Sequence, residues 1–232
     1  MPAFVSLSLR RVALVLLFVV PLAGCGLADY EAKMIEAQRR GQRLEEEFKN
    51  LDEPLTLPTR KEDGVETPLA NLFLRPPRGI SSTCEPTPLN GLIYRYPQQQ
   101  TATNLPAGVK PVRDVLAVSL AFGNNRPDFT NEVLRNFAPA EKVHRAPHEI
   151  RGPSNATAAV YDVLEFDDVG YSYSIYVGQY ETTQVAVIYT IRKGQRSSVS
   201  GPLTLSMESL AFGADADRAR RDYAKQRPAA KK

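Results

Sequence analysis

The chain has 232 residues and a formal net charge of +3 at pH 7, with 29 lysines and arginines against 26 aspartates and glutamates. So small an excess gives no electrostatic basis for nucleic-acid binding, which we exclude. The length is enough for one domain of ordinary size with extensions, and two cysteines are too few for a disulfide framework.

The first 25 residues carry a positive start, an apolar run and a short motif that ends in a cysteine. Arg10 and Arg11 precede Val12–Val20, in which all nine residues are apolar. Nine residues are far short of the roughly 20 that span a bilayer, but they suit the apolar region of a secretory signal. The tetrapeptide Leu22-Ala23-Gly24-Cys25 resembles the lipobox of bacterial lipoprotein precursors. The alternative is an ordinary signal peptide cleaved at the same place.

The lipobox resemblance implies that residues 1–24 are a signal peptide and that the mature chain begins at Cys25. In that class, a peptidase recognises the residues that correspond to Leu22, Ala23 and Gly24, and the thiol corresponding to Cys25 carries acyl chains such as palmitate. Buried acyl chains contribute about 0.8 kcal/mol per methylene, so several of them hold a protein on a membrane permanently. Gly26 is not the aspartate that retains enterobacterial lipoproteins at the inner membrane. By resemblance, we expect the chain on the outer membrane, facing the periplasm.

A heptad pattern follows the cysteine, within a segment that we place at residues 25–53. Apolar or small residues recur at alternating spacings of three and four, namely at Leu27, Tyr30, Met34, Ala37, Gly41, Leu44, Phe48 and Leu51. This spacing predicts an amphipathic helix of roughly 35–40 Å with a coiled-coil seam, ended by Pro54. Two interpretations remain open. One is a self-associating stalk. The other is a single helix that rests on its own domain, which Gly41 favours because it costs about 1 kcal/mol relative to alanine and packs nothing.

Residues 54–90 are predicted to be a proline-rich linker or wrapping arm. Each residue before a proline is pushed out of the helical region, so Arg75-Pro76-Pro77-Arg78 must be extended. Cys84 has no partner within the chain if Cys25 is lipidated. We interpret Cys84 as an incidental loop residue, with a reactive thiol or a bond to another chain as alternatives.

Residues 91–213 are predicted to form the folded domain without help from residues 26–90. Gly91–Tyr96 and Asp114–Phe122 have the pattern of strands, and the second is apolar on both faces. A helix capped by Asn125 should place Phe129, Val133, Leu134 and Phe137 on one side. A proline-containing loop follows, with Pro139, Pro147 and Pro153.

Three antiparallel strands at Val160–Phe166, Tyr171–Val177 and Gln184–Ile191 are the predicted centre of the domain. Each has one bulky and one mostly small face, and we expect helices to pack on the small faces. A helix opened by Pro202 and closed by Gly213 completes the domain. Residues 214–232 are interpreted as a polar, basic C-terminal tail that can extend as a helix.

The predicted fold class is α+β, an antiparallel sheet packed with helices, preceded by a long helix and the proline-rich arm. The order of elements resembles the PsbP-like α/β/α sandwich over residues 90–213, beginning at Tyr94-Arg95-Tyr96-Pro97 and ending in the helix with Ser206 and Ser209. The tryptophan that often follows the early proline in that family is missing here. The resemblance implies a binding or assembly module more readily than an enzyme.

Few residues suggest chemistry. His144 and His148 have the spacing of two metal ligands on one helix face, but Pro147 interrupts them. Glu165, Asp167 and Asp168 resemble a small cation site, although Asp-Asp-Val-Gly is ordinary hairpin chemistry. Beyond Glu141 or Glu149, no third ligand for the histidines is evident, and we predict no metal, cofactor or catalytic set.

Two function classes remain open. The first is a lipid-anchored interaction or assembly module of the cell envelope, whose partner is an envelope protein or a second copy bound through residues 27–51. The second is a lipid-anchored ligand-binding protein that uses a tyrosine-rich sheet. An open cleft beside Tyr173 and Tyr189 would favour the second class.

Overall fold

The computed structural model divides the chain into two compact units, Met1–Glu47 and Phe48–Lys232. It describes residues 6–62, 65–68, 70–87, 93–99, 109–124, 127–137, 142–152 and 158–226, without the side chains of residues 6–26, 60–62, 65–68, 86–87 and 124.

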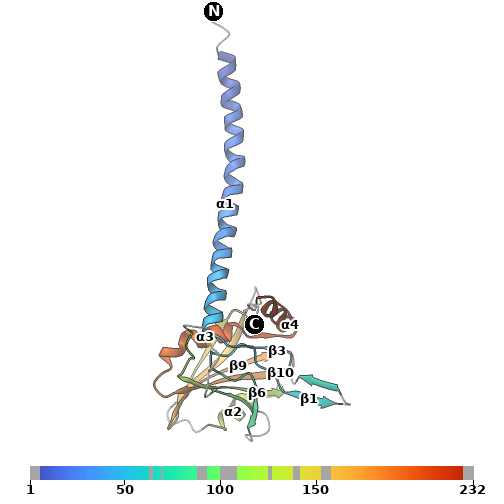
Figure 1. Cartoon of the computed structure of the whole chain (residues 1–232), viewed down its shortest axis with the longest axis vertical. Coiled ribbons are helices and arrows are strands. Elements are labelled where there is room, and N and C mark those ends of the chain that lie inside the picture. Colours follow the sequence, from blue (N-terminus) through green and yellow to red (C-terminus); the bar gives the residue numbers. More distant parts are fainter. Residues whose placement is uncertain are drawn as a thin grey trace, which may run out of the picture. The chain divides into compact units, whose positions relative to one another are not determined.

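Helix α1 runs without a break from Ser6 to Asn50 (Figure 1). Ion pairs four residues apart support its exposed surface, including Lys33 to Asp29 at 3.2 Å and Arg40 to Glu36 at 2.9 Å. The helix predicted from the heptad pattern is confirmed. Among the described residues, no helix has an apolar stretch long enough to cross a membrane.

The last turn of α1 belongs to the second unit, and this shortens the predicted seam. Leu51, just after the helix, is completely buried in the second unit. The ring of Phe48 lies 6.1 Å from that of Tyr223. Phe48 and Leu51 are therefore already packed, and the part of the seam that stays available ends at Leu44.

In the described part of the second unit, seven strands form one antiparallel sheet in the order β4-β5-β6-β10-β9-β8-β7. Their bounds are β4 Glu85–Thr87, β5 Ile93–Pro97, β6 Val115–Asn124, β7 His144–Ile150, β8 Ala159–Asp167, β9 Tyr171–Tyr180 and β10 Thr183–Arg192. The predicted three-strand meander is β8-β9-β10. The α+β class is confirmed.

Helices cover both faces of the sheet (Figure 1). Helix α2, Phe129–Leu134, buries Phe129 and Val133 on one face, as its apolar spacing predicts. The short helix η1, Ser197–Val199, and helix α3, Ser200–Glu208, pack on the other face. The predicted cap Asn125 lies outside the described residues, and the residue before α2 is Asp128.

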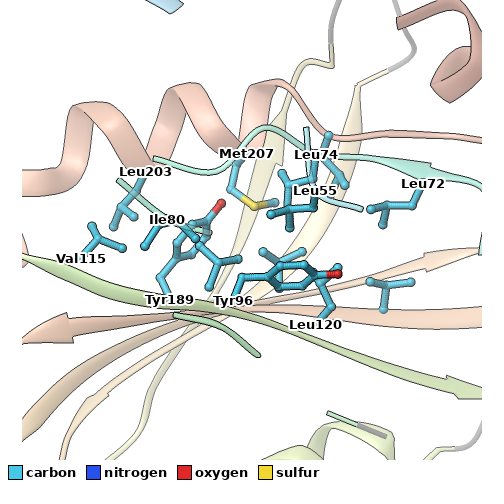
Figure 2. Packing of buried hydrophobic residues seen from close by; sticks show 14 of the residues in the cluster. Leu55, Leu72, Leu74, Ile80, Tyr96, Val115, Leu120, Tyr189, Leu203 and Met207 are labelled. Carbon is cyan, nitrogen blue, oxygen red and sulfur yellow. The ribbon is translucent and has the colours of Figure 1, made fainter. Parts of the chain in front are cut away.

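The proline-rich arm is part of the core and not a separate linker. Leu72, Leu74 and Ile80 are at most 1% exposed, and they pack with Leu203 and Met207 of α3 over the sheet (Figure 2). Helix α3 has nine residues, about 13 Å, whereas a ten-residue strand such as β10 extends about 33 Å. One short helix cannot cover this face, so the arm covers the rest. Of the two alternatives for residues 54–90, the packing favours the wrapping arm. Independent folding of residues 91–213 stays a prediction.

Bulky and small faces alternate from strand to strand, which differs from the prediction. Tyr189 of β10 lies opposite Ser174 of β9, and Ile191 lies opposite Ser172. Helix α3 packs on the bulky face of β10, beside the small face of β9. Large side chains on one strand lie next to small ones on its neighbour, so both layers can pack closely.

Three further elements differ from the sequence-based expectations. Strand β7 occupies a predicted loop, and its edge position tolerates Pro147 because one side of an edge strand needs no donors. Helix α3 ends at Glu208, and Gly213, with φ of 54°, begins helix α4 instead of closing α3. A second pair of short strands, β3 Leu72–Phe73 and β11 Ala211–Phe212, joins the arm to the C-terminal region.

The predicted C-terminal tail is folded over most of its length. Helix α4, Gly213–Gln226, buries Ala216 against Phe73 and Ala211, with Tyr223 partly buried beside them. Residues 227–232 lie outside the described part of the chain. The remaining elements, β1 Thr59–Glu62 and β2 Val65–Pro68, form a two-stranded hairpin.

Candidate functional site

The residues of the lipobox, Leu22 to Cys25, lie within α1, and their side chains fall outside the described part of the chain. Lipidation of Cys25 and recognition of Leu22, Ala23 and Gly24 therefore stay predictions. Cys84 is a partly buried free cysteine packed against the core of the α3 side.

The two histidines are exposed on the edge strand β7. Because side chains alternate along a strand, His144 and His148 share a face, but their Cα atoms are separated by about 13 Å instead of one helical turn. Glu149 lies on the opposite face, and Glu141 lies outside the described residues. Among the described residues, no group of three or more histidine, cysteine or acidic side chains could hold a metal ion.

Tyr173 and Tyr189 lie on opposite faces of the sheet and do not share a cleft. Tyr189 is completely buried on the α3 side, and its hydroxyl donates a hydrogen bond to Ser206 Oγ at 2.9 Å. Tyr173 is 8% exposed on the α2 side, where its ring packs 4.7 Å from that of Phe137. Burial raises the pKa of both phenols above the ordinary value. Both tyrosines are core residues, so the open cleft that would favour ligand binding is not formed by them.

A cavity of about 600 Å³ lies where the β8–β9 hairpin meets the loop before α3. We call it the Arg196 pocket, and it is lined by Glu165, Asp167, Ser172, Gly194, Arg196, Ser197 and Ser200. Strand alternation places Glu165 and Asp167 on one face of β8, and the register sets them opposite Ser174 and Ser172 of β9. The acidic residues noted in the sequence are thus brought together with a cation from the loop before α3.

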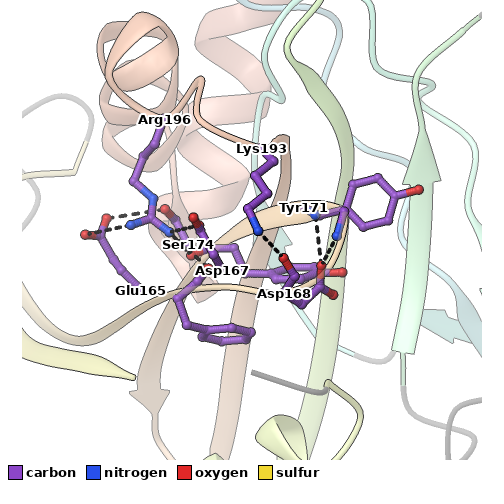
Figure 3. A network of polar contacts seen from close by, with 10 residues as sticks. Glu165, Asp167, Asp168, Tyr171, Ser174, Lys193 and Arg196 are labelled. Carbon is purple, nitrogen blue, oxygen red and sulfur yellow. Dashed lines mark hydrogen bonds and ion pairs between the residues drawn. The ribbon is translucent and has the colours of Figure 1, made fainter. Parts of the chain in front are cut away.

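Arg196 ties this loop to the hairpin (Figure 3). Its guanidinium donates to the carbonyl oxygens of Phe166 at 3.1 Å and Tyr173 at 2.9 Å. It also pairs with Glu165 at 3.5 Å and Asp167 at 3.6 Å. All three charged side chains are about one third exposed, so water weakens these pairs. The hydrogen bonds to the carbonyl groups hold the loop, and the carboxylates balance the charge.

The turn beside this pocket is closed by Asp168. Its Oδ1 accepts hydrogen bonds from the N–H groups of Gly170 at 2.9 Å and Tyr171 at 2.8 Å. Desolvation raises the pKa of Asp168, but these hydrogen bonds outweigh it, so the pKa lies below its usual value. Lys193 donates to the carbonyl of Asp168 at 2.9 Å (Figure 3). This is the hairpin chemistry that the Asp-Asp-Val-Gly sequence predicts.

Two serines at or beside the Arg196 pocket form hydrogen bonds within the chain. The hydroxyl of Ser200 donates to the carbonyl of Ser197 at 3.1 Å, so it faces a backbone acceptor and not a base. The hydroxyl of Ser174 donates to Glu165 at 3.3 Å, and Ser174 is only 1% exposed. A nucleophile needs a base within hydrogen-bond reach. Ser174 has one in Glu165 but is buried, whereas the described hydrogen bond of Ser200 is to a backbone carbonyl.

A second open cavity, of about 500 Å³, separates the arm from α4. It is lined by Leu55, Thr56, Leu57, Thr59, Asn71, Asp217 and Arg220. Arg220 donates to Asn71 Oδ1 at 2.7 Å, to the carbonyl of Leu72 at 2.6 Å and to Asp217 at 2.9 Å. Its donors hold α4 to the arm, so this cavity is lined by structural contacts.

The Arg75-Pro76-Pro77-Arg78 segment receives the C-terminal turn of α1, a role that sequence reasoning missed. Arg78 donates through its side chain to the carbonyl of Phe48 and through its N–H to that of Asn50 at 2.8 Å. The guanidinium of Arg75 lies 5.0 Å from the ring centre of Phe48 and donates to the carbonyl of Asp52 at 3.1 Å. The last carbonyls of a helix lack partners and favour cations. The sequence feature that could have indicated this contact is a pair of arginines beside prolines, beginning 25 residues after α1 ends at Asn50.

Two serines of α3 hold the same segment from its other side. Ser206 Oγ donates to the carbonyl of Arg75 at 2.7 Å, and Ser209 Oγ accepts from the N–H of Arg75 at 2.9 Å. Both serines are at most 6% exposed. They supply the buried backbone of an extended segment with partners that a neighbouring strand would otherwise provide.

No protein-family model and no curated protein sequence matches the chain. Among solved structures, the chain is similar to the solution structure of cyanobacterial PsbP (CyanoP) from Synechocystis sp. PCC 6803. The sequence identity is 11%, the TM-score is 0.39, and the match covers 62% of this chain and 87% of CyanoP. This is a distant PsbP-like resemblance.

Proposed function

We propose that this chain is a lipid-anchored lipoprotein of the bacterial cell envelope that works by contact with other proteins. The observation that carries the proposal is the motif Leu22-Ala23-Gly24-Cys25 directly after a basic start and a nine-residue apolar run. Cys25 holds the acyl chains, the chain faces the periplasm, and Gly26 after the cysteine favours the outer membrane.

The helix after the cysteine supports a role as a spacer. Residues 26–47 of α1 measure about 33 Å at 1.5 Å per residue. Residues 27–43 are exposed, and ion pairs between neighbouring turns support them. A rod of this kind sets a distance between an anchored end and whatever follows it.

The second unit is proposed to act as an interaction module. Two arginines that line the cavities hold segments of the chain together: Arg196 holds the loop before α3, and Arg220 holds α4. This use of charged groups supports contact more than turnover. Ligand binding by a tyrosine-rich cleft finds no support in the buried positions of Tyr173 and Tyr189.

Lipidation is tested by changing Cys25→Ser in the full chain, with Cys84→Ser as the matched control. We expect the Cys25→Ser protein to lose incorporation of labelled palmitate and to stay unprocessed or become soluble. The Cys84→Ser protein should be labelled and membrane-bound like the natural chain. A Cys25→Ser protein that remains fully membrane-bound with the normal mature mass refutes the proposal.

The proposal that the protein acts through contacts with other proteins and not by catalysis is tested by single alanine substitutions. The residues are His144, His148, Glu165, Asp167 and Cys84. Each variant should restore the phenotype of a strain that lacks this protein, because none of these groups is proposed to do chemistry. Fractionation and circular dichroism confirm anchoring and fold in each case. One variant that is folded, anchored and unable to restore the phenotype would establish a catalytic or metal site instead.

A further inference from the structure

A stripe of exposed apolar side chains runs along the first unit of the chain. Leu27 is 61% exposed, Tyr30 is 64% exposed and Met34 is 55% exposed. Ala37 and Gly41 continue the stripe at heptad spacing, and a Cβ atom added at Gly41 would meet nothing within 4 Å. Apolar side chains that recur on one side of a helix are normally covered.

We infer that a second copy of this chain covers the stripe, in a parallel, in-register pair of helices over residues 27–44. The inference deepens the proposed function by naming a partner, and it rests on the lipid at Cys25. The pairing ends at Leu44 because Phe48 and Leu51 are packed in the second unit.

The charges beside the stripe fit a parallel pair. Each heptad of the stripe has a first and a second apolar position. In a parallel coiled coil, the residue that precedes the first position faces the residue five places further along the other helix. Arg40 of one copy therefore meets Glu45 of the other, and symmetry repeats the pair. Lys33 meets Gln38 in the same arrangement, so no like charges face each other.

An antiparallel pair is disfavoured by the same residues. If the helices ran in opposite directions with Leu27 beside Leu44 of the second copy, Lys33 would face Arg40 of that copy. This repulsion would occur twice by symmetry. Two copies anchored in one membrane through Cys25 also point the same way, so the anchor and the charges select the same arrangement.

The membrane explains how so short a seam can hold two chains. Two and a half heptads that include Ala37 and Gly41 among their seam positions form a weak coil in free solution. Tethering raises effective concentrations into the millimolar range without adding contacts. We therefore expect pairs on the membrane and single chains for a soluble Cys25→Ser protein at micromolar concentration.

The test is oxidative cross-linking of the full, anchored chain in a Cys84→Ser background. Met34→Cys and Ala37→Cys place a thiol on the seam, whereas Ala32→Cys and Arg39→Cys place it on the opposite side of the helix. We expect a disulfide-linked band of twice the chain mass from the seam positions and at most a trace from the other two. Equal cross-linking at all four positions, or none at any, overturns the inference.

Charge reversal tests the direction of the helices. In the Met34→Cys protein, Arg40→Glu should weaken pairing roughly tenfold, because two attractive contacts become repulsive. Adding Glu45→Arg should restore it, whereas Arg39→Glu should have no effect. If the double reversal does not restore cross-linking, or if the product contains a different protein, the parallel pair is wrong.

The outcomes separate this inference from the proposed function. Membrane fractionation and palmitate labelling are measured on the same samples. Anchored, labelled protein without seam cross-links refutes the pair and leaves the lipoprotein proposal intact. Protein that is neither labelled nor membrane-bound refutes both.

Discussion

Replacing Leu74 with alanine tests whether the proline-rich arm is part of the folded core. Leu74 is completely buried and packs with Leu55, Leu72 and Met207 on the α3 side of the sheet (Figure 2). Truncating a buried leucine removes its transfer free energy and leaves a cavity, which costs roughly 2–5 kcal/mol. Domains of this size are stable by about 5–15 kcal/mol, so the loss would be a large fraction of the total.

The assay is urea unfolding of the soluble Cys25→Ser protein, followed by circular dichroism. The midpoint should fall while the slope stays the same, because the unfolded chain exposes the same surface. Leu27→Ala is the control, since Leu27 is 61% exposed and its truncation should change stability by at most about 0.5 kcal/mol. A Leu74→Ala protein as stable as the control would refute the assignment of the arm to the core.

Two further predictions concern buried hydroxyl groups. Ser206→Ala removes the acceptor of the Tyr189 hydroxyl and should lower the free energy of unfolding in urea by roughly 1–3 kcal/mol. Adding Tyr189→Phe should recover part of this loss. If the two substitutions were purely additive, the hydrogen bond would not contribute to stability. Burial raises the pKa of Tyr161 to about 12, from 10.0. The unfolded chain therefore loses this proton first, and stability should fall as the pH rises from about 10 to 12, by roughly 2–3 kcal/mol for this residue. Tyr161→Phe should reduce that dependence between pH 10 and 12, and an unchanged slope would contradict the assignment to Tyr161.

Local patterns were sufficient wherever one segment carries its own periodicity. The heptad spacing from Leu27 predicted a helix, and α1 extends to Asn50. The run Asp114–Phe122 predicted a strand covered on both faces, and β6 has side chains in both cores. These elements follow from spacing alone because a period of two or of 3.6 residues is a property of neighbouring residues.

Local patterns failed wherever burial depends on a distant segment. Leu72 and Leu74 read as spaced apolar residues in a proline-rich stretch, and nothing nearby indicated that α3 is too short to cover its face of the sheet. The arm is therefore buried in the core, where it covers the part of this sheet face that α3 does not reach. Strand β7 was missed for a related reason, since Pro147 argues against a strand unless that strand lies at an edge.

The candidate sites divide in the same way. The two histidines and the tyrosines Tyr173 and Tyr189 were selected by residue type, but their geometry depends on the strands that carry them. A strand separates His144 from His148 by about 13 Å, and the pleat sends Tyr173 and Tyr189 to opposite faces. Arg196 was not selected at all, because its carbonyl partners on Phe166 and Tyr173 are at least 23 residues away.

By itself, the sequence determined the lipobox resemblance, the long helix and the three-strand meander, since each depends on residues within a few positions of one another. The tertiary structure decided which segments pack against each other. It places β10 at the centre of the sheet, large side chains beside small ones, and the arm against α3. It also decided that Arg75 and Arg78 meet the end of α1. A buried cation is tolerated only where partners surround it, and those partners come from segments that local sequence does not bring together.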